Sequence, residues 1–516
     1  MSDDASEESA PEESDGHRPT TLTRRLMIMI SVVLGSTLYS TTLLIASTLL
    51  PQMQGAMSAT QDEVAWVMTF NILATAVVTP MTGWLVARFG PRHVMTGSML
   101  CFSVFTYLCG AADSLESLVL WRILQGATGA PVIPLSQNIL FDSFPRRQHR
   151  MIMSVYGMAV VVGPVIGPAL GGYLADMYSW RWAFYLLVPV GVASFVGLRF
   201  SMLPDLPRHP VRLDWIGFLS LSAAISGVQL VLSRGQRLDW YESPEIWLET
   251  FGAAVAFYLF LAHSLTAERP FLNLRLLLDR NYALGLALVG VFGMLNVTPM
   301  VLLPPLLQQH AGYTDSLIGA VLAARGAGAA CGFFAALFIA KLDPRIGMTI
   351  GFGLQVISGL WLMSINLDVD MSVLMANSAI QGSAIGIIWV PLTIATFATL
   401  ESRYWPEAMA VFHLLRNIGS SFFISVCVAD IVRITAQNYS RMNEMISPFN
   451  DRLALPWVMG GWSTETLPGL ARLAKEVNRQ AAMIGYLDAF GMYTAASAGA
   501  ILLVLLVSRR RRAAGA

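Results

Sequence analysis

The feature that most constrains this chain is a series of long apolar runs that recurs along almost its whole length. A helix needs about 20 apolar residues to cross a hydrocarbon core about 30 Å thick. By that measure the sequence predicts fourteen spans, at 26–49, 64–86, 93–112, 115–140, 151–175, 181–203, 213–233, 246–266, 281–307, 316–340, 346–366, 369–399, 407–432 and 485–508. A helix satisfies its own backbone hydrogen bonds in lipid. We therefore expect an all-α integral membrane protein.

The charges predict how the chain lies in the membrane. Charged residues make up 13% of the chain and the formal net charge is zero, so the charge balance gives no reason to expect a nucleic-acid partner. Loops rich in Lys and Arg stay on the cytoplasmic side. Most of the 33 basic residues fall in cytoplasmic segments if both ends of the chain are inside. We expect a multi-pass protein of the cell inner membrane with both termini in the cytoplasm.

Composition divides the chain into five segments. Residues 1–23 are acidic and poor in apolar side chains, which is typical of a disordered tail. The others are a six-helix half at 24–203, a linker with two inserted helices at 204–280, a second six-helix half at 281–508, and a basic cytoplasmic tail at 509–516. The second half contains a long external loop at 433–484. Apolar residues at helical spacing in this loop, from Leu467 to Val477, predict an amphipathic helix on the membrane surface.

A short internal repeat supports the two halves. Gln125-Gly126 in the fourth span recurs as Gln381-Gly382 in the twelfth, and Gly163 recurs as Gly419 at the same offset. Parallel halves of this kind place a substrate site at their interface, near the bilayer midplane.

Three motifs narrow the class of protein. A turn between spans two and three has the sequence Gly83-Trp-Leu-Val-Ala-Arg88-Phe-Gly90-Pro-Arg92. Span four contains Arg122-Ile-Leu-Gln125-Gly126, and span five contains Gly163-Pro164-Val-Ile-Gly167-Pro-Ala-Leu-Gly171. In this order and at these helix positions, the motifs resemble the signature motifs of the major facilitator superfamily, and the third resembles its antiporter motif.

The resemblance narrows to the fourteen-helix drug:proton antiporter branch, the EmrB-like multidrug exporters. Further stretches carry it, among them Trp180-Arg-Trp182 and Leu414-Leu-Arg416-Asn417. It implies two six-helix halves with two inserted helices, alternating access, and export of lipophilic or amphiphilic compounds in exchange for protons. It also implies a periplasmic membrane-fusion adaptor protein as a candidate partner.

Three positions depart from that branch. Thr42 and Ala87 stand where the branch usually carries an Asp, and Leu187 replaces an Asn. The first two departures remove carboxylates, and all three argue against the branch's usual proton-coupling route. Two alternatives to multidrug export therefore stay open: a dedicated exporter of one endogenous metabolite or lipid with atypical coupling, and a non-transporting membrane sensor or scaffold.

Arg122 is the strongest candidate for coupling, because a guanidinium inside a span costs a few kcal/mol to insert and therefore points to function. The alternative is a structural role, in which Arg122 ties helices together through carbonyls and Gln125. The predicted transport and coupling residues are Arg122, Gln125, Gly126, Asp488 and Arg416. By sequence position Arg416 and Arg325 lie nearer the ends of their spans, where a long side chain reaches the headgroups.

Span five is predicted to act as a gate, because Gly163, Gly167 and Gly171 permit close helix packing and Pro164 permits a bend. Candidate cavity residues are polar or aromatic side chains of spans one, two, nine and twelve: Tyr39, Thr42, Trp66, Asn71, Asn296 and Trp389. An apolar pocket with a few polar groups suits lipophilic ligands. The sequence contains no phosphate-binding loop, metal-ligand spacing or nucleophile elbow, so we expect no enzyme, cofactor or metal.

Overall fold

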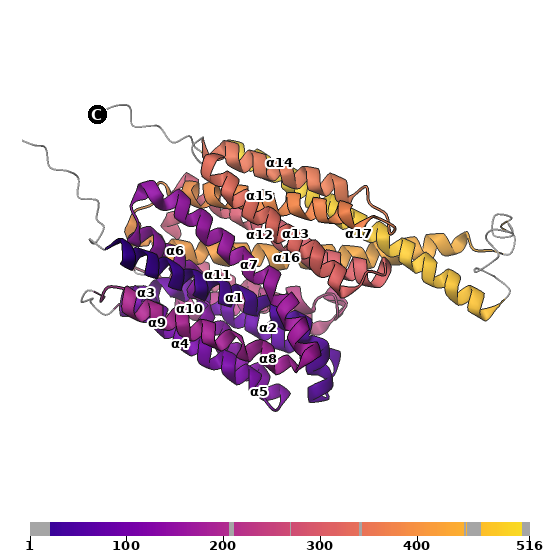
Figure 1. Cartoon of the computed structure of the whole chain (residues 1–516), viewed down its shortest axis with the longest axis horizontal. Helices are drawn as coiled ribbons and strands as arrows, with labels where there is room; N and C mark the ends of the chain where they lie inside the picture. Colours follow the sequence, from indigo (N-terminus) through magenta and orange to yellow (C-terminus); the bar gives the residue numbers. More distant parts are fainter. Residues whose placement is uncertain are drawn as a thin grey trace, which may run out of the picture.

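The computed structural model describes residues 21–205, 211–268, 270–339, 343–447, 450 and 466–507. These residues form a bundle of long helices (Figure 1). The first half holds α1 (Leu22–Met57), α2 (Gln61–Val78), α3 (Thr82–Phe89), α4 (Pro91–Gly110), α5 (Leu115–Gly129), α6 (Val132–Ser143), α7 (His149–Met177), α8 (Trp180–Tyr185) and α9 (Leu187–Ser201). The inserted pair is α10 (Trp215–Arg234) and α11 (Pro244–Thr266). The second half holds α12 (Arg280–Pro305), α13 (Asp315–Ile339), α14 (Pro344–Leu362), α15 (Met371–Phe397), α16 (Trp405–Glu444) and α17 (Leu467–Leu506).

Every predicted span coincides with helix. Some spans are made of shorter pieces: α2 and α3 are joined by a 3-10 turn at Thr79–Met81, and α5 and α6 together form the fourth span. Among the described residues, 13 segments are long and apolar enough to cross a membrane. The 29-residue α7 occupies the remaining predicted position. The all-α membrane fold is therefore confirmed.

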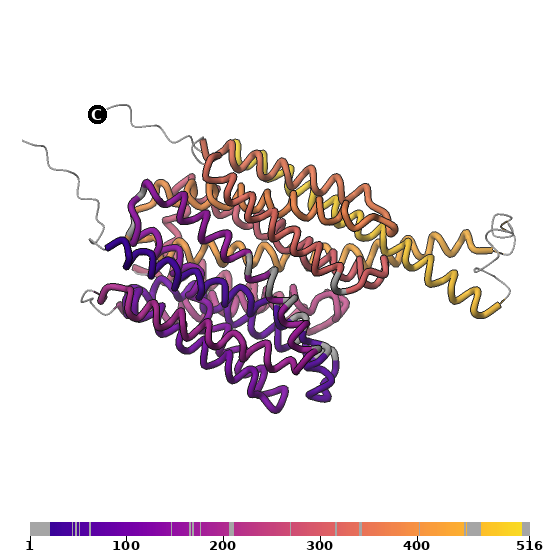
Figure 2. The backbone as a smooth tube through the Cα atoms, in the orientation of Figure 1, coloured from indigo at the N-terminus to yellow at the C-terminus, as the bar shows by residue number. Residues whose placement is uncertain are grey.

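The two halves share one packing scheme. In each half the first helix packs on the fifth, the second on the fourth and the third on the sixth: α1 on α7, α2 on α5 and α4 on α9, then α12 on α16, α13 on α15 and α14 on α17. Figure 2 shows the halves side by side, the first in indigo to magenta and the second in orange to yellow. This common scheme agrees with the internal repeat in the sequence.

One end of the bundle holds the start of α1, the turn between α3 and α4 and the end of α17 (Figure 1). We call it the basic end, because the turn there carries Arg88 and Arg92. At the opposite end, α16 and α17 extend beyond the other helices as a helical hairpin (Figure 1). Much of the predicted loop 433–484 is therefore helix. The expected surface helix is instead the first part of α17, continuous with the last span and packed along α16 through side chains such as Leu473.

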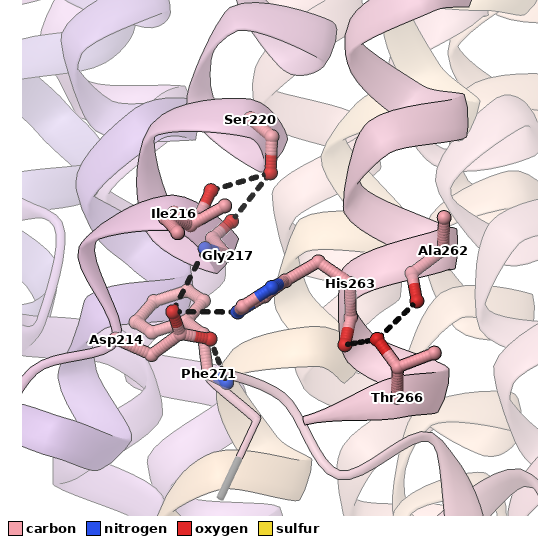
Figure 3. Close-up of polar contacts among 8 residues, drawn as sticks. All are labelled: Asp214, Ile216, Gly217, Ser220, Ala262, His263, Thr266 and Phe271. Atoms are coloured by element: carbon pink, nitrogen blue, oxygen red, sulfur yellow. Dashed lines mark hydrogen bonds and ion pairs between the residues drawn. The ribbon is translucent and has the colours of Figure 1, made fainter.

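The inserted helices α10 and α11 are tied together at their basic end by Asp214 (Figure 3). Its Oδ1 accepts a hydrogen bond from Gly217 N–H at 3.0 Å and lies 2.9 Å from His263 Nε2. Its Oδ2 accepts from Phe271 N–H at 3.0 Å. Partial burial acts to raise the pKa of Asp214, but these hydrogen bonds outweigh it and the pKa lies below its usual value. One carboxylate thus caps α10 and joins it to α11 and the following segment.

Replacing Asp214 with alanine should destabilise the protein, because the α10 cap and the link to His263 are both lost. Removal of an N-cap side chain alone costs about 1 kcal/mol. Thermal unfolding in detergent measures the effect. In the wild type the contribution of Asp214 should be present above the unfolded carboxylate pKa of about 3.9 and be lost as the pH falls through the lower, folded pKa. An unchanged unfolding temperature for Asp214→Ala at pH 7 would contradict this role.

Candidate functional site

Arg122 lies in the interior of the first half, where its side chain is 0% exposed. The guanidinium donates from Nη1 to Gln125 Oε1 at 2.6 Å and from Nε to the Val67 carbonyl of α2 at 3.3 Å. Its Cζ atom lies 5.9 Å from the centre of the Phe184 ring. The cation is therefore held by neutral oxygen acceptors and an aromatic face.

The surrounding contacts hold α5 against both α4 and α2. The Gln125 amide donates to Thr106 Oγ1 at 2.8 Å, and Asn71 Nδ2 donates to the Arg122 carbonyl at 2.7 Å. Gly126 is needed at this crossing because a Cβ there would collide with the Asn71 carbonyl. Three of the predicted coupling residues and one predicted cavity residue thus form a single network.

The second half contains a matching pair, Arg325 and Gln381. Arg325 Nη1 donates to Gln381 Oε1 at 3.3 Å, and Nη2 donates to the backbone carbonyl of Asn296. Arg325 is only 4% exposed. The expectation that this side chain reaches the headgroups is therefore wrong, because it turns inward to amide and carbonyl acceptors.

The two arginine–glutamine pairs show how the halves are related. Gln125 and Gln381 occupy corresponding positions on α5 and α15, and both are fully buried. Arg122 lies on the same helix as its glutamine, whereas Arg325 reaches its glutamine from the neighbouring helix α13. The repeat therefore preserves the position of the glutamine and its arginine partner, although the arginine is supplied by a different helix in each half.

Arg416 lies where the two halves meet. It is about one third of the way along α16, so it is not at a helix end, and it is partly exposed. Its Nη2 donates to Asn417 Oδ1 at 3.2 Å, and its Cζ atom lies 5.7 Å from the centre of the Trp389 ring. Across the interface it interacts electrostatically with Tyr39 and Tyr156 of the first half. The headgroup expectation is wrong here as well, because the guanidinium lies against the Trp389 ring and the first-half tyrosines and not at the membrane surface.

The predicted gate residues lie on the face of α7 that packs on α1. A Cβ on Gly163 would lie 2.6 Å from the Thr37 carbonyl, and one on Gly167 would lie 3.0 Å from the Thr41 carbonyl. Gly171 is buried further along the same helix, and Pro164 is partly buried. The corresponding Gly419 on α16 packs in the same way against α12. These glycines let the first and fifth helices of each half touch through their backbones.

The predicted cavity residues do not form one site. Tyr39 and Trp389 are buried near Arg416, and Asn71 and Asn296 belong to the two arginine networks. Thr42 is buried, but its hydroxyl donates to the Leu38 carbonyl of its own helix at 2.7 Å. Trp66 is 44% exposed on α2. Its assignment to the cavity stays a prediction, because exposure alone does not distinguish a cavity from the lipid-facing surface.

The turn motif holds the basic end together. Gly90 has a φ of +86°, which favours glycine, and the Asp205 carboxylate occupies the space that a Cβ would need. That carboxylate accepts from Arg92 N–H at 3.2 Å, at the start of α4. Arg88 Nη1 donates to the Val211 carbonyl at 3.1 Å, which attaches the motif to the segment leading into α10.

Residue contacts between the halves gather toward the basic end. Gln137 of α6 and His413 of α16 are both buried, with Oε1 and Nε2 3.0 Å apart. Nearer the end, a Cβ on Gly83 would lie 3.0 Å from the Cα atom of Glu407. A small cavity of about 150 Å³ lies between Phe141 of the first half and Ile394 of the second, among other residues. These contacts join the halves at this end.

Asp488, the remaining predicted coupling residue, lies apart from the arginines. It is exposed on α17, close to Asp430 on α16. Gly485 permits this close crossing, since a Cβ there would lie 2.8 Å from the Ile431 carbonyl. The structure therefore places this carboxylate where α16 and α17 cross, at the start of the helical hairpin.

Sequence reasoning did not find the cross-half pair of Gln137 and His413 or the role of Arg325. For Arg325 a signal existed, because Gln381 repeats Gln125 and a buried glutamine beside one cation predicts a second. Gln137 carried no such signal, since it is one of several polar residues in span four.

The fold and the buried arginines define a polytopic membrane protein that is made of two related helical halves. The family described as Major Facilitator Superfamily matches residues 32–424. The chain belongs to this family of membrane transporters.

Several relatives resemble the chain over most of its length. Multidrug export protein EmrB of Escherichia coli (strain K12) is 30% identical over 468 residues, which cover 90% of each chain. Fatty acid resistance protein FarB of Neisseria gonorrhoeae is 31% identical over 414 residues, covering 79% of this chain and 81% of the relative. Among solved structures, the human organic anion transporter MFSD10 has a TM-score of 0.59 at 13% identity, covering 94% of this chain and 100% of that structure. This last likeness concerns the fold alone.

Proposed function

We propose that this chain exports lipophilic or amphiphilic compounds by proton antiport with alternating access. The observation that carries the proposal is the arrangement of the halves: they are joined through side chains at the basic end, while Arg416 lies partly exposed between them. Relatives named for multidrug export and fatty acid resistance support export as the direction of transport. The chain acts as a transporter and not as an enzyme.

The basic end faces the cytoplasm in this proposal, because basic loops are retained on that side. The protein then lies in the cell inner membrane with both termini inside. Contacts such as Gln137–His413 close the cytoplasmic side in the conformation described. Opening toward the cytoplasm must break these contacts. Their free energy therefore contributes to the equilibrium between the outward-facing and inward-facing states.

In this proposal the two halves move relative to each other at helix α7. Its basic end packs on α13, where Gly157 lies directly against the Phe333 ring, and its middle packs on α1 through Gly163 and Gly167. Backbone-to-backbone packing of this kind lets one helix shift along another without side chains interlocking. Arg122, in the preceding span, biases the switch when a proton or a ligand changes the charge nearby.

The helical hairpin of α16 and α17 supports a periplasmic adaptor as partner. The hairpin projects from the end opposite the basic end and presents exposed apolar side chains, including Met445, Leu467 and Leu470. Exposed apolar surface of this kind favours protein contact. An adaptor bound there would carry exported compounds away from the inner membrane.

A second candidate function is a dedicated exporter of one acidic metabolite or lipid. The observation that favours it is that the buried residues of the described chain include Arg122 and Arg325 but no Asp or Glu. A multidrug exporter of cationic compounds needs an interior carboxylate to pair with them.

Nile red, a neutral lipophilic dye, tests export in a host without its own efflux pumps. Cells that express the chain should accumulate less dye than vector controls, and a protonophore should remove the difference. The comparison is made at equal dye loading and equal cell density. Accumulation that stays low after the gradient collapses would rule out proton coupling.

A further inference from the structure

We propose that Arg416 binds the acidic headgroup of an anionic amphiphile, and that such compounds are the preferred substrates. This inference rests on the proposed export function and names its substrate class. Arg416 is suited to the role because it is a cation at the interface between the halves and is partly exposed.

The hydrogen bonding of Arg416 leaves donors for a ligand. A guanidinium has five N–H donors in a planar fork. Among the described residues, Arg416 donates to one side chain, through Nη2 to Asn417 Oδ1 at 3.2 Å. Most of the fork is therefore available.

The two other interior guanidiniums do not have this freedom. Arg122 is fully buried and engages Val67 and Gln125, and Arg325 is 4% exposed and engages Asn296 and Gln381. Each makes at least two hydrogen bonds to acceptors of its own half and is almost fully buried, so neither is accessible to a ligand. Arg416 differs in two ways. Most of its N–H donors have no acceptor among the described residues, and it lies between the two halves.

Charge balance selects an anion over a cation. Among the described residues no Asp or Glu is fully buried, and the hydrogen bonds of Arg122, Arg325 and Arg416 go to neutral acceptors. A carboxylate, phosphate or sulfonate would pair with the guanidinium fork through two parallel hydrogen bonds. A cationic amphiphile would instead be repelled, which makes the same site selective.

Aromatic side chains next to Arg416 provide the apolar part of the site. The Trp389 ring lies beneath its guanidinium and is packed against Phe292, with ring centres 5.2 Å apart. On the side of the first half, Tyr39 packs against Phe102 with ring centres 5.9 Å apart. A charged headgroup at Arg416 would therefore have aromatic surface beside it for its tail.

The test uses the full chain in phosphatidylcholine nanodiscs and three ligands with the same ten-carbon tail: decanesulfonate, decanol and decyltrimethylammonium. Empty nanodiscs give the background partitioning. Wild-type protein should bind the sulfonate more tightly than the ammonium compound. Arg416→Gln should weaken sulfonate binding about tenfold, the loss expected for a charge-assisted hydrogen bond, and change decanol binding less than twofold. Arg416→Lys should lie between them.

Arg433→Gln is the matched control, because Arg433 is an exposed cation on the same helix beyond the interface. It should bind all three ligands as wild type does. Repeating the sulfonate measurement in phosphatidylglycerol separates the two sources of the headgroup. Competition by this anionic lipid assigns the site to a membrane lipid, and its absence assigns the site to a free amphiphile.

Two results would overturn the proposal: wild type binding the ammonium compound at least as tightly as the sulfonate, or Arg416→Gln binding the sulfonate with unchanged affinity. The first does not depend on the folding of any variant. Gradient-dependent Nile red efflux is measured separately, in cells that express the same variants. It tests the export proposal independently of the substrate-class proposal. Efflux without sulfonate preference contradicts the substrate class alone, and sulfonate binding without efflux contradicts export alone.

Discussion

Replacing Gly163 with leucine should reduce export at least about tenfold while the protein still reaches the membrane. The Cβ alone would lie 2.6 Å from the Thr37 carbonyl and 2.8 Å from Thr41 Oγ1. The first of these atoms belongs to the α1 backbone, so the clash is relieved only if α1 and α7 separate. Efflux of Nile red per unit of surface protein measures the loss.

Gly172→Leu is the control for Gly163→Leu, because it lies on the same helix and a Cβ there has no heavy atom within 4 Å. It adds the same side chain without the collision, and it should retain nearly wild-type efflux. Normal efflux by Gly163→Leu would show that the close contact between α1 and α7 is not needed for transport.

Arg122→Ala and Arg122→Lys should both lose export. Alanine removes the guanidinium and leaves Gln125 Oε1 and the Val67 carbonyl without this donor, at a cost of about 1–3 kcal/mol for each buried acceptor. Lysine keeps the charge but lacks the planar fork that reaches both acceptors at once. Because these acceptors lie on different helices and are reached through different nitrogens, charge alone is not enough.

Efflux of the Arg122 variants is compared at equal amounts in the membrane, with Arg433→Ala as a control that removes an exposed cation. Partial efflux by the lysine variant alone would mean that Arg122 acts through its charge and not its geometry. Full efflux by Arg122→Ala would reduce Arg122 to a packing residue and remove it from the coupling mechanism.

The spans were predictable because crossing a bilayer requires apolarity at almost every position of a long segment. The faces of those helices were not predictable. Trp66, for example, is 44% exposed, and a helix that is apolar all round gives no sign of which side meets lipid and which meets a cavity. The direction of Arg416 was a second error: the start of its span was predicted to within two residues, but the sequence does not show that this side chain lies at the interface between the halves.

The site was predictable only where one residue was unusual by itself. Arg122 stood out as a cation within a span, and the structure shows it buried in a polar network. The pairing of Gln137 with His413 joins positions 276 residues apart in different halves. No local pattern in the sequence specifies such a contact, because it depends on how the two halves dock.

The most direct test of proton-coupled export is proton movement in proteoliposomes that contain only this chain. An outward gradient of a neutral lipophilic substrate is imposed with no starting pH difference, and the internal pH is followed with a trapped indicator. Antiport predicts that protons enter as substrate leaves, so the interior should acidify, and protein-free liposomes should show no such change. Substrate efflux with no proton movement, or with protons leaving together with the substrate, would contradict proton antiport.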